Sequence, residues 1–526
     1  MSMVTKGMSL GMLTFAAGLA VTSPAFAQQV TLTSSDGTVN MTGIFKEFRD
    51  NNYVISTALG DMRVSASRVS CVGDACPTFE EVEADLVVGG SDTVGLALMP
   101  LLLEGYAGAI GAAADLVNTG EGDDIVANLI GDEGFGDEIG SILVNSTTSS
   151  RGFDELLANE VEVSMASRRI RPAEARELRA AGAGNMISPT QEHIVAIDSL
   201  VVITHPDNPV SSLTSEQIRQ IYSGQITNWS EVGGNDVPIL VVARPEGSGT
   251  RSVFESRMFG DAGIELTANA NIVDTNEDAA RLANEELGTI AYVGYAFQRG
   301  ANALTLVNDC GIATEPSPFA ARTEEYALQR RLYLYSREDT LTDNGRAMLD
   351  YATSDAADAI IGKAGFIGFA VDRREMSLEG PRARALLDPN ADNYEASYMR
   401  RMLSMMADYD RLSTTFRFRT GSSQLDERGR IDKERLINYL AMQPEGTEIM
   451  MVGFTDSVGQ FDGNLNLSAQ RAGQVANELA GSAGDRLPNI SVSSVGFGEI
   501  APSGCNESEE GRRINRRVEV WIKTPA

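Results

Sequence analysis

The spacing of apolar and polar side chains changes along the chain and marks out its domains. Residues 28–80 alternate apolar and polar positions over short runs, VTLTSSDGTVNMTG and NNYVISTALGDMRVSAS, with Asp36-Gly37 and Gly60-Asp61 at the breaks. Alternation with a period of two, interrupted by Gly and Asp, is typical of antiparallel strands joined by tight turns. We therefore predict a small all-β module over residues 28–80.

Residues 84–375 have a different pattern, in which short apolar runs precede segments whose apolar residues have the spacing of a helix. The runs DLVVGG, VEVSMAS and HIVAIDSLVVITH are strand-like, and RPAEARELRAAG and TSEQIRQIYSG are helix-like. Pro172 and Gly182 are suited to the first turn and the end of one helix, and Thr214 with Gln217 forms a capping-box pattern before another. This alternation predicts an α/β domain.

A second α/β unit is predicted over residues 411–526, after a helical linker over residues 376–410. Its runs are TTFRFRTGSSQLD, ERGRIDKERLINYLAMQP, EIMMVGFTD, LSAQRAGQVANELAGS and ISVSSVGFG. The order strand, helix, strand, helix, strand fits one sheet with helices on one face.

The first residues have the pattern of a secretory signal peptide. Lys6 supplies positive charge, residues 8–21 are apolar, and Ala25-Phe26-Ala27 is a small-residue cleavage site. We predict a signal peptide over residues 1–27 and export to the periplasm of a Gram-negative-type cell.

Composition and charge restrict the possible functions. A length of 526 residues requires several domains, and the net charge of -30 argues against nucleic acid and anionic membrane surfaces as partners. The later apolar stretch 94–117 contains Pro100, Glu104 and Asp115, so a buried or amphipathic helix is expected there. The chain has 2 histidines, which argues against a His-based metal centre or catalytic triad. We expect no metal, no cofactor and no enzymatic activity.

The 4 cysteines differ in what their positions predict. Cys71 and Cys76 lie close together in CVGDAC, and in an exported protein this spacing predicts a small disulfide loop. Cys310 and Cys505 lie in different predicted domains, and the sequence leaves open whether they pair or remain free thiols.

Three segments rich in Gly, Ser and Thr are each placed where a helix is expected to begin. They are residues 89–93, 146–152 and 244–250, and the last contains Arg244. A helix N-terminus presents unpaired N–H groups and partial positive charge, hydroxyls add donors, and a guanidinium matches an oxyanion. Each segment alone is more often an ordinary connection. Together they predict a site for a small tetrahedral oxyanion.

The central region resembles the PstS-type phosphate-binding proteins of ABC transporters. The similar residues are HIVAIDSLVVITHPDNPVSSLTSEQIRQIYSGQITNWSEVGG, VVARPEGSGTR, VEVSMASRR and GTIAYVGYA. The resemblance implies a two-lobed, type 2 periplasmic-binding-protein fold that closes on its ligand. It also implies the phosphate-binding residues, which are Ser91, Thr93, Ser149, Ser150, Ser167, Arg244, Ser248, Gly249 and Thr250.

One position departs from the pattern of this family. Many members carry an Asp after the serine that corresponds to Ser167, where it accepts the proton of HPO4 and rejects sulfate. Here that position is Arg168, so Asp92 or Asp198 is a candidate for the Asp role. The alternative for Arg168 and Arg169 is a solvated surface pair.

The C-terminal unit contains an acidic and a basic residue that could together bind a zwitterion. Asp456 follows a strand, and Arg471 is expected in the first turn of the next helix; an internal salt bridge between them is the alternative. GFTDSVGQFDGNLNLSAQRA, GFGEIAP and GRRINRRVEV resemble the OmpA-type peptidoglycan-binding domain. The resemblance implies an OmpA-like α/β sandwich in which Asp456, Asn464 and Arg471 bind the diaminopimelate stem. Arg516 and Arg517 either shape the site or pack against the sheet.

The sequence thus predicts an α/β multidomain protein that captures phosphate or a similar oxyanion and is held noncovalently to peptidoglycan, near the outer membrane. An ABC permease is a possible further partner. The alternative is an envelope structural or interaction protein whose binding-protein domain has no small ligand. A phosphatase is disfavoured because no activated nucleophile or metal cluster is evident.

Overall fold

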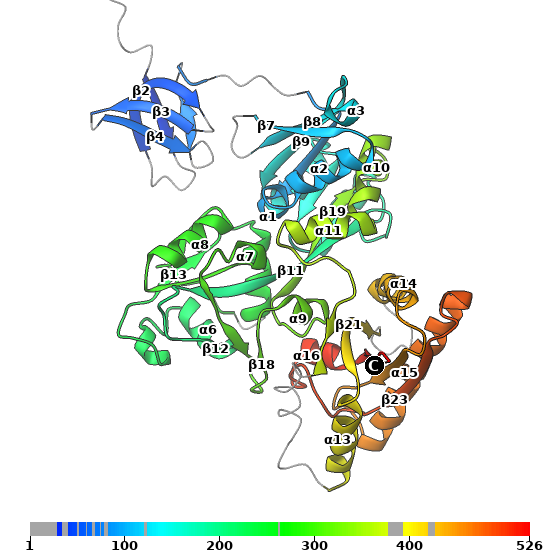
Figure 1. The fold of residues 1–526 in the computed structure, drawn as a ribbon. Coiled ribbons are helices and arrows are strands. Elements are labelled where there is room, and N and C mark those ends of the chain that lie inside the picture. Colours follow the sequence, from blue (N-terminus) through cyan, green and yellow to red (C-terminus); the bar gives the residue numbers. More distant parts are fainter. Residues whose placement is uncertain are drawn as a thin grey trace, which may run out of the picture. The chain divides into compact units, whose positions relative to one another are not determined.

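The computed structural model divides the chain into two compact units, residues 1–81 with 120–122, and residues 82–119 with 123–526 (Figure 1). The signal peptide predicted for residues 1–27 lies outside the described residues. The structure describes residues 29–33, 40–49, 52–58, 60–65, 69–73, 75–77, 83–119, 124–260, 263–376, 393–418 and 427–525.

The first unit is a five-stranded antiparallel sheet in the order β4-β3-β2-β1-β5. Its strands alternate buried and solvent-facing side chains as their sequence predicts, with Val30, Leu32, Tyr53 and Ile55 in the core. The structure joins Cys71 to Cys76. The strands are β1 (Gln29–Thr33), β2 (Asn40–Arg49), β3 (Asn52–Thr57), β4 (Gly60–Ser65) and β5 (Ser70–Val72).

The second unit contains a long mixed sheet of 11 strands. In spatial order they are β14 (Asn271–Ile272), β13 (Leu240–Ala243), β15 (Thr289–Gly294), β11 (Glu192–Thr204), β19 (Gln329–Ser336), β10 (Val163–Ala166), β6 (Leu86–Ser91), β9 (Glu138–Thr147), β8 (Ile125–Ile130) and β7 (Ala113–Asn118), with β16 (Asn302–Ala303) paired to β11. A separate sheet has the order β12 (Ser212–Thr214), β17 (Thr305–Val307) and β18 (Ala313–Thr314).

Strands β11 and β19 connect two lobes. The first half of β11 pairs with β19, and its second half pairs with β15. β19 in turn pairs with β10 of the first lobe. Each lobe has an additional core of its own, around Phe153 and Tyr335 in the first lobe and around Tyr222 and Phe254 in the second. Because the pairing of β11 and β19 joins the two lobes, these strands are placed to act as a hinge.

The helices of this region begin and end where the sequence signals predict. Pro172 occupies the first position of α5, and Gly182 follows the helix with a φ of 91°. Thr214 and Gln217 form the predicted capping box of α6. The helices are α1 (Asp92–Gly95), α2 (Met99–Ala109), α3 (Gly131–Gly134), α4 (Ser149–Ala158), α5 (Pro172–Ala180), α6 (Ser215–Tyr222), α7 (Gly249–Met258), α8 (Asn276–Glu285), α9 (Pro318–Arg322), α10 (Asp343–Ala352) and α11 (Asp355–Lys363).

The apolar stretch 94–117 is only partly the predicted helix. It forms the buried helix α2 and then turns into strand β7, which pairs with β8. Within the residues that the structure describes, no helix combines the length and the apolar character needed to cross a bilayer.

The C-terminal sheet has the order β20-β21-β24-β22-β23. Leu436 of α14 and Val475 of α15 pack on one face, against Ile449 and Val520, as predicted. The other face is covered by α13, whose Met402 and Met406 contact Met450 and Trp521. Helices therefore lie on both faces, because α13, within the predicted linker, packs as part of this sheet. The elements are β20 (Arg373–Arg374), α13 (Asn393–Met406), β21 (Asp410–Arg417), α14 (Glu427–Ala441), β22 (Glu448–Gly453), α15 (Phe461–Ala483), β23 (Ser491–Gly496), α16 (Glu509–Asn515) and β24 (Arg517–Lys523).

Candidate functional site

The predicted anion loops all leave the ends of strands. In the first lobe, β6 leads into α1, β9 leads to α4, and β10 leads to Ser167; β6 pairs in parallel with both β9 and β10. In the second lobe, β13 leads to Arg244 and α7. Because parallel strands end at the same edge of a sheet, their loops meet there, where ligands commonly bind in α/β proteins.

Side chains from the two lobes meet directly. Thr93 Oγ1 of the first lobe lies 3.4 Å from Thr250 Oγ1 of the second. Ser149 Oγ lies 3.3 Å from Ser167 Oγ, and both face the start of α7, where a Cβ added to Gly249 would collide with these two hydroxyls. These four hydroxyl side chains are fully buried. The structure is therefore a closed form of the two lobes.

Arg244, which follows β13 in the second lobe, has 1% of its surface exposed and reaches the first-lobe residue Asp92, which precedes Thr93. Its Nη2 donates to Asp92 Oδ2 at 2.8 Å and to the carbonyl of Asp274. Its Nε and Nη1, and the hydroxyl of Ser91, have no hydrogen-bond partner among the described residues. Buried donors without partners are destabilising, and an oxyanion between them would satisfy them.

Ser150 and Arg168 lie beside this cluster. Arg168 Nη2 donates to Ser150 Oγ at 3.1 Å, and the guanidinium forms an ion pair with Glu174 at 2.6 Å. The alternative of a solvated pair is wrong for Arg168, which is 5% exposed, because α5 supplies the carboxylate that compensates its charge. Arg169 is half exposed and pairs with Glu192.

Ser248 completes the second-lobe loop. It is buried, and its hydroxyl accepts the N–H of Arg251 at 3.4 Å as the N-cap of α7. The structure thus brings together Ser91, Thr93, Ser149, Ser167, Arg244, Gly249 and Thr250, with Ser248 supporting the helix start and Ser150 directed to Arg168.

The C-terminal candidate residues also lie together. Asp456 follows β22, and its Oδ2 accepts from Arg516 Nη1 at 2.7 Å. Asn464 Nδ2 donates to the carbonyl of Asp456 at 3.3 Å and to Glu499. Asp456 and Arg516 therefore form an ion pair, which assigns Arg516 a contact in the candidate site. Arg517 is fully buried, stacks on Phe454 and packs within the sheet.

Arg471 differs from its predicted placement. Helix α15 begins at Phe461, ten residues earlier, so Arg471 lies well inside the helix and not in its first turn. Its guanidinium lies over the ring of Phe418 at 5.1 Å, and its Nε and Nη1 have no partner among the described residues. Burial, together with the charge of Arg516, lowers the pKa of Arg471. Arg471 thus retains donors for a ligand, and the internal pair with Asp456 is replaced by the pair with Arg516.

The comparisons with known proteins match two parts of the chain. Residues 117–356 match the PBP superfamily domain, and residues 417–516 match the OmpA family. The phosphate-binding protein PstS of Staphylococcus saprophyticus is 30% identical over 236 residues, covering 43% of this chain and 71% of that protein. The chain belongs to the PstS family, fused to an OmpA-family domain.

Two further proteins are similar to this chain. PstS of Staphylococcus epidermidis is 31% identical over 200 residues, or 37% of this chain, and the chain spans 59% of the length of that relative. The solved structure of an ABC-type phosphate transport receptor from Vibrio cholerae is 24% identical with a TM-score of 0.40, covering 54% of this chain and 99% of that one.

Two residues near the anion cluster of this PstS-family chain were not found from the sequence. Arg330 of β19 is buried, and its Nη1 donates to Thr250 Oγ1 at 2.7 Å. Asn276 at the start of α8 donates to Thr93 Oγ1 at 3.2 Å. The signal for Arg330 was a charged residue inside an otherwise apolar strand, QRRLYLYS, because a buried charge needs a specific partner.

The two candidate acids have different surroundings. Asp198 is fully buried, pairs with Arg330 at 2.7 Å, and accepts the N–H groups of Ser199 and Tyr295. Asp92 is adjacent to Thr93 and contacts Arg244. The carboxylate of Asp198 already accepts these hydrogen bonds and this ion pair, so Asp92 is the better candidate to contact a ligand.

Proposed function

We propose that the central domain binds inorganic phosphate between its lobes. The observation that carries the proposal is Arg244, a buried guanidinium with two nitrogens unpartnered among the described residues, which contacts Asp92 between Ser91 and Thr93. The relatives named as phosphate-binding proteins support the same ligand. A tetrahedral oxyanion there would accept charge-assisted hydrogen bonds from Arg244 and from the loop N–H groups.

Asp92 gives this site a means of selecting phosphate over sulfate. A carboxylate beside the anion can accept a hydrogen bond from HPO4, which carries a proton near neutral pH, whereas fully ionised sulfate offers none and would be repelled. We infer that Asp92 takes the part of the Asp that the sequence lacks at Arg168.

Calorimetric titration of phosphate into the full chain, stripped of ligand, tests the phosphate site. Arg244→Ala should weaken binding by about 30-fold or more, because truncating one member of a buried charged contact typically costs about 2–5 kcal/mol. Arg281→Ala is the matched control, since this arginine is half exposed on α8. No heat with phosphate in folded wild-type protein would favour the alternative, an envelope interaction protein without a small ligand.

We further propose that the OmpA-family domain binds peptidoglycan in the periplasm through Asp456, Asn464 and Arg471. Arg471 has donors for a carboxylate that lack a partner among the described residues, and Asp456 offers an acceptor for an ammonium. The protein would then be a wall-bound phosphate receptor, and delivery to an ABC permease is a further step of the same proposal.

Sedimentation with purified diaminopimelate-type sacculi tests the wall site. Arg471→Ala should reduce the bound fraction with an affinity loss of about tenfold or more, from the loss of a charged hydrogen bond. Arg486→Ala, at an exposed arginine of the same domain, should bind as wild type. Equal sedimentation of wild type and Arg471→Ala would contradict the assigned site.

A further inference from the structure

A cavity of about 600 Å³ is lined by three parts of the chain. It lies beside the anion cluster, which consists of the hydroxyl side chains of Thr93, Ser149, Ser167 and Thr250. The first lobe contributes the loop after β10, the second lobe contributes α7 and the start of β19, and the C-terminal domain contributes α16. The arginines that line it are Arg168, Arg169, Arg171, Arg257, Arg330, Arg331 and Arg513.

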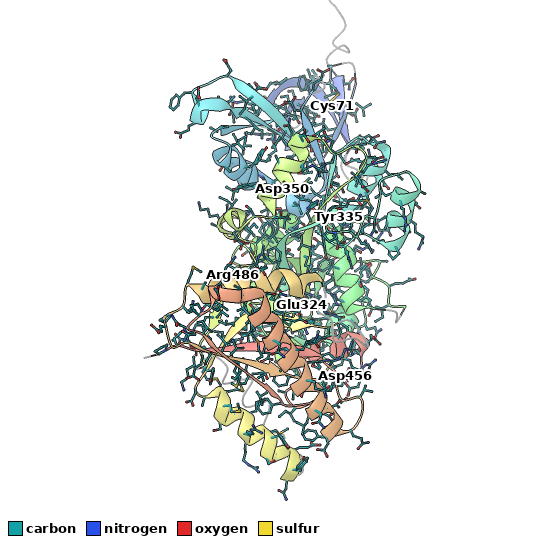
Figure 2. All side chains as sticks on the ribbon, turned by 90° about the vertical axis from the view of Figure 1, so that its right-hand side faces the viewer. Cys71, Glu324, Tyr335, Asp350, Asp456 and Arg486 are labelled. Carbon is teal, nitrogen blue, oxygen red and sulfur yellow. A yellow bond between two sulfur atoms is a disulfide. The ribbon has the colours of Figure 1, made fainter. Side chains whose placement is uncertain are left out.

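The cavity carries an excess of positive charge in a chain whose net charge is -30. Among the described residues, the ion pairs of its seven arginines involve five carboxylates, because three carboxylates are shared. Glu510 pairs with Arg257 and Arg513, Glu324 pairs with Arg331 and Arg513, and Glu174 pairs with Arg168 and Arg171. The carboxylates are Glu174, Glu192, Asp198, Glu324 and Glu510. Glu324 is labelled in Figure 2.

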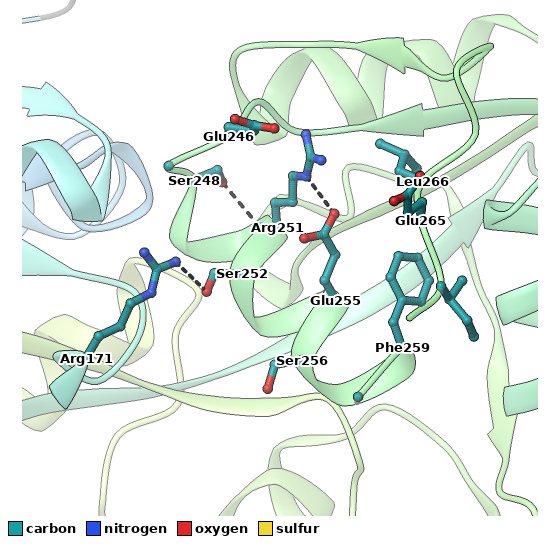
Figure 3. Close-up of a pocket in the computed structure, with 13 residues that line it drawn as sticks. Arg171, Glu246, Ser248, Arg251, Ser252, Glu255, Ser256, Phe259, Glu265 and Leu266 are labelled. Carbon is teal, nitrogen blue, oxygen red and sulfur yellow. Dashed lines mark hydrogen bonds and ion pairs between the residues drawn. The ribbon is translucent and has the colours of Figure 1, made fainter. Parts of the chain in front are cut away.

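Arg171 is the least compensated of these arginines. Its side chain is 51% exposed, and its guanidinium Nη1 lies 3.9 Å from Oε1 of Glu174, a carboxylate that is already paired with Arg168. Figure 3 shows Arg171 extending from the first lobe toward Ser252 on α7, to which it donates at 3.2 Å. The buried Arg168 adds an Nε that has no partner among the described residues. Because Arg168 Nε is itself buried, the guanidinium of Arg171 is the more accessible of the two at the cavity.

The adjoining cavity gives a contrast. It has about 750 Å³, shares Arg171 and Ser252, and is drawn in Figure 3. Its charged lining consists of Arg171, Arg251, Glu246, Glu255 and Glu265, with Arg251 paired to Glu255. Acidic residues outnumber basic ones there, so the two neighbouring cavities differ in the sign of their charged lining.

The arginine-lined cavity suits an anion larger and more highly charged than orthophosphate. Guanidinium groups bind oxyanions through pairs of parallel hydrogen bonds, and several around one cavity can bind several oxyanion groups at once. None of Ser149, Arg244 and Thr250 lines this cavity. Arg330 connects the two sites, since it lines the cavity and donates to Thr250.

We propose that this cavity is a second anion site, which binds a short condensed phosphate chain such as tripolyphosphate. The ligand would contact Arg171 of the first lobe, Arg257 of the second lobe and Arg513 of the C-terminal domain. It would therefore join both lobes to the wall-binding domain. This site does not depend on the orthophosphate proposal, because Arg171, Arg257 and Arg513 are not among the residues proposed to bind orthophosphate.

Calorimetric titration of sodium tripolyphosphate into the full chain, saturated with orthophosphate, tests the proposal. Binding is expected in wild type and in Arg244→Ala. The double variant Arg171→Gln, Arg257→Gln should lose about tenfold or more in tripolyphosphate affinity, since two charged contacts are removed. Arg281→Gln, at an exposed, ion-paired arginine outside the cavity, should retain wild-type affinity.

Three results would overturn the proposal. The first is that tripolyphosphate does not bind to folded wild-type protein. The second is that tripolyphosphate competes with orthophosphate and its binding is lost in Arg244→Ala. The third is that Arg281→Gln and the double variant lose tripolyphosphate affinity equally. Orthophosphate titration of the double variant is the second readout, and its affinity should stay within about twofold of wild type. If the orthophosphate proposal were wrong, the orthophosphate titration would show no binding, and the tripolyphosphate titration would be unaffected.

Discussion

At the scale of residues, arginines that lie close together in the fold have different roles. Arg244 has two nitrogens without a partner in the part of the chain that the structure describes, whereas Arg330 binds Asp198 and Thr250. Arg168 pairs with Glu174 and lies over Phe153. Because the residue type is the same in all three, only the partners of each guanidinium distinguish an arginine that can bind a ligand from one that forms a structural ion pair.

Gly249 is the residue that allows the two lobes to meet. Gly249→Ala should weaken phosphate binding by about fivefold or more, because the added Cβ would collide with the hydroxyls of Ser149 and Ser167 and overpacking typically costs about 1–3 kcal/mol. Calorimetric titration measures the loss. Gly362→Ala is the control, since a Cβ at that helical glycine meets nothing within 4 Å. Unchanged affinity in Gly249→Ala would show that binding does not require this closure.

At the scale of elements, helix termini position the chemistry. The N-terminus of α7 places Gly249 and Thr250 in the cleft, with Ser248 as its cap. Helix α16 contributes Glu510 and Arg513 to the arginine-lined cavity, and the residue after it, Arg516, pairs with Asp456. Helix α16 therefore lines the arginine-lined cavity, and the residue after its end contacts the candidate peptidoglycan site.

The capping box of α6 should support that helix measurably. Thr214 Oγ1 accepts the N–H of Gln217 at 3.1 Å, and Gln217 Oε1 accepts the N–H of Thr214 at 2.9 Å. Thr214→Ala should destabilise the helix start by about 1 kcal/mol. Hydrogen exchange at the Gln217 amide should then become faster, whereas Thr214→Ser, which keeps the acceptor, should exchange like wild type. Equal protection in both variants would contradict a stabilising cap.

At the scale of the whole molecule, the second lobe and the OmpA-family domain form one connected body. The structure joins Cys310 to Cys505 and pairs Glu325 with Arg411 through two hydrogen bonds. Glu324 is buried and pairs with Arg417 and Arg513 of the C-terminal domain. It follows that hinge closure should move the first lobe relative to the second lobe and the wall-binding domain together.

Glu510 makes this connection dependent on pH. Burial acts to raise its pKa, but the hydrogen bond from Arg513 and the charge of Arg257 outweigh burial and lower the pKa from 4.5 to about 2. A lowered pKa contributes stability that is complete above pH 4.5 and is lost as the pH falls toward 2. The difference in melting temperature between wild type and Glu510→Gln should therefore shrink over that range.

The exposed Glu507 supplies the control for this measurement. Scanning calorimetry of Glu507→Gln should give the wild-type melting temperature at each pH, because no comparable ion pair is removed. A difference between wild type and Glu510→Gln that stays constant from pH 4.5 to pH 2 would contradict the depressed pKa.

The sequence by itself determined the local structure and the types of domain. Alternation with a period of two predicted the N-terminal sheet, caps predicted α5 and α6, and two motif sets predicted the PstS-like and OmpA-like folds. These signals lie within a few residues of each other, so they can be recognised without tertiary information.

Only the tertiary structure decided which distant groups are partners. The pairing of Cys310 with Cys505, the packing of α13 on the C-terminal sheet, and the roles of Arg168, Arg330 and Arg516 all depend on contacts between segments far apart in the chain. Local sequence indicates that a residue is charged or apolar. Which carboxylate, hydroxyl or apolar face lies opposite is fixed by the packing of whole elements, because that packing minimises unpaired buried charge and exposed apolar surface together.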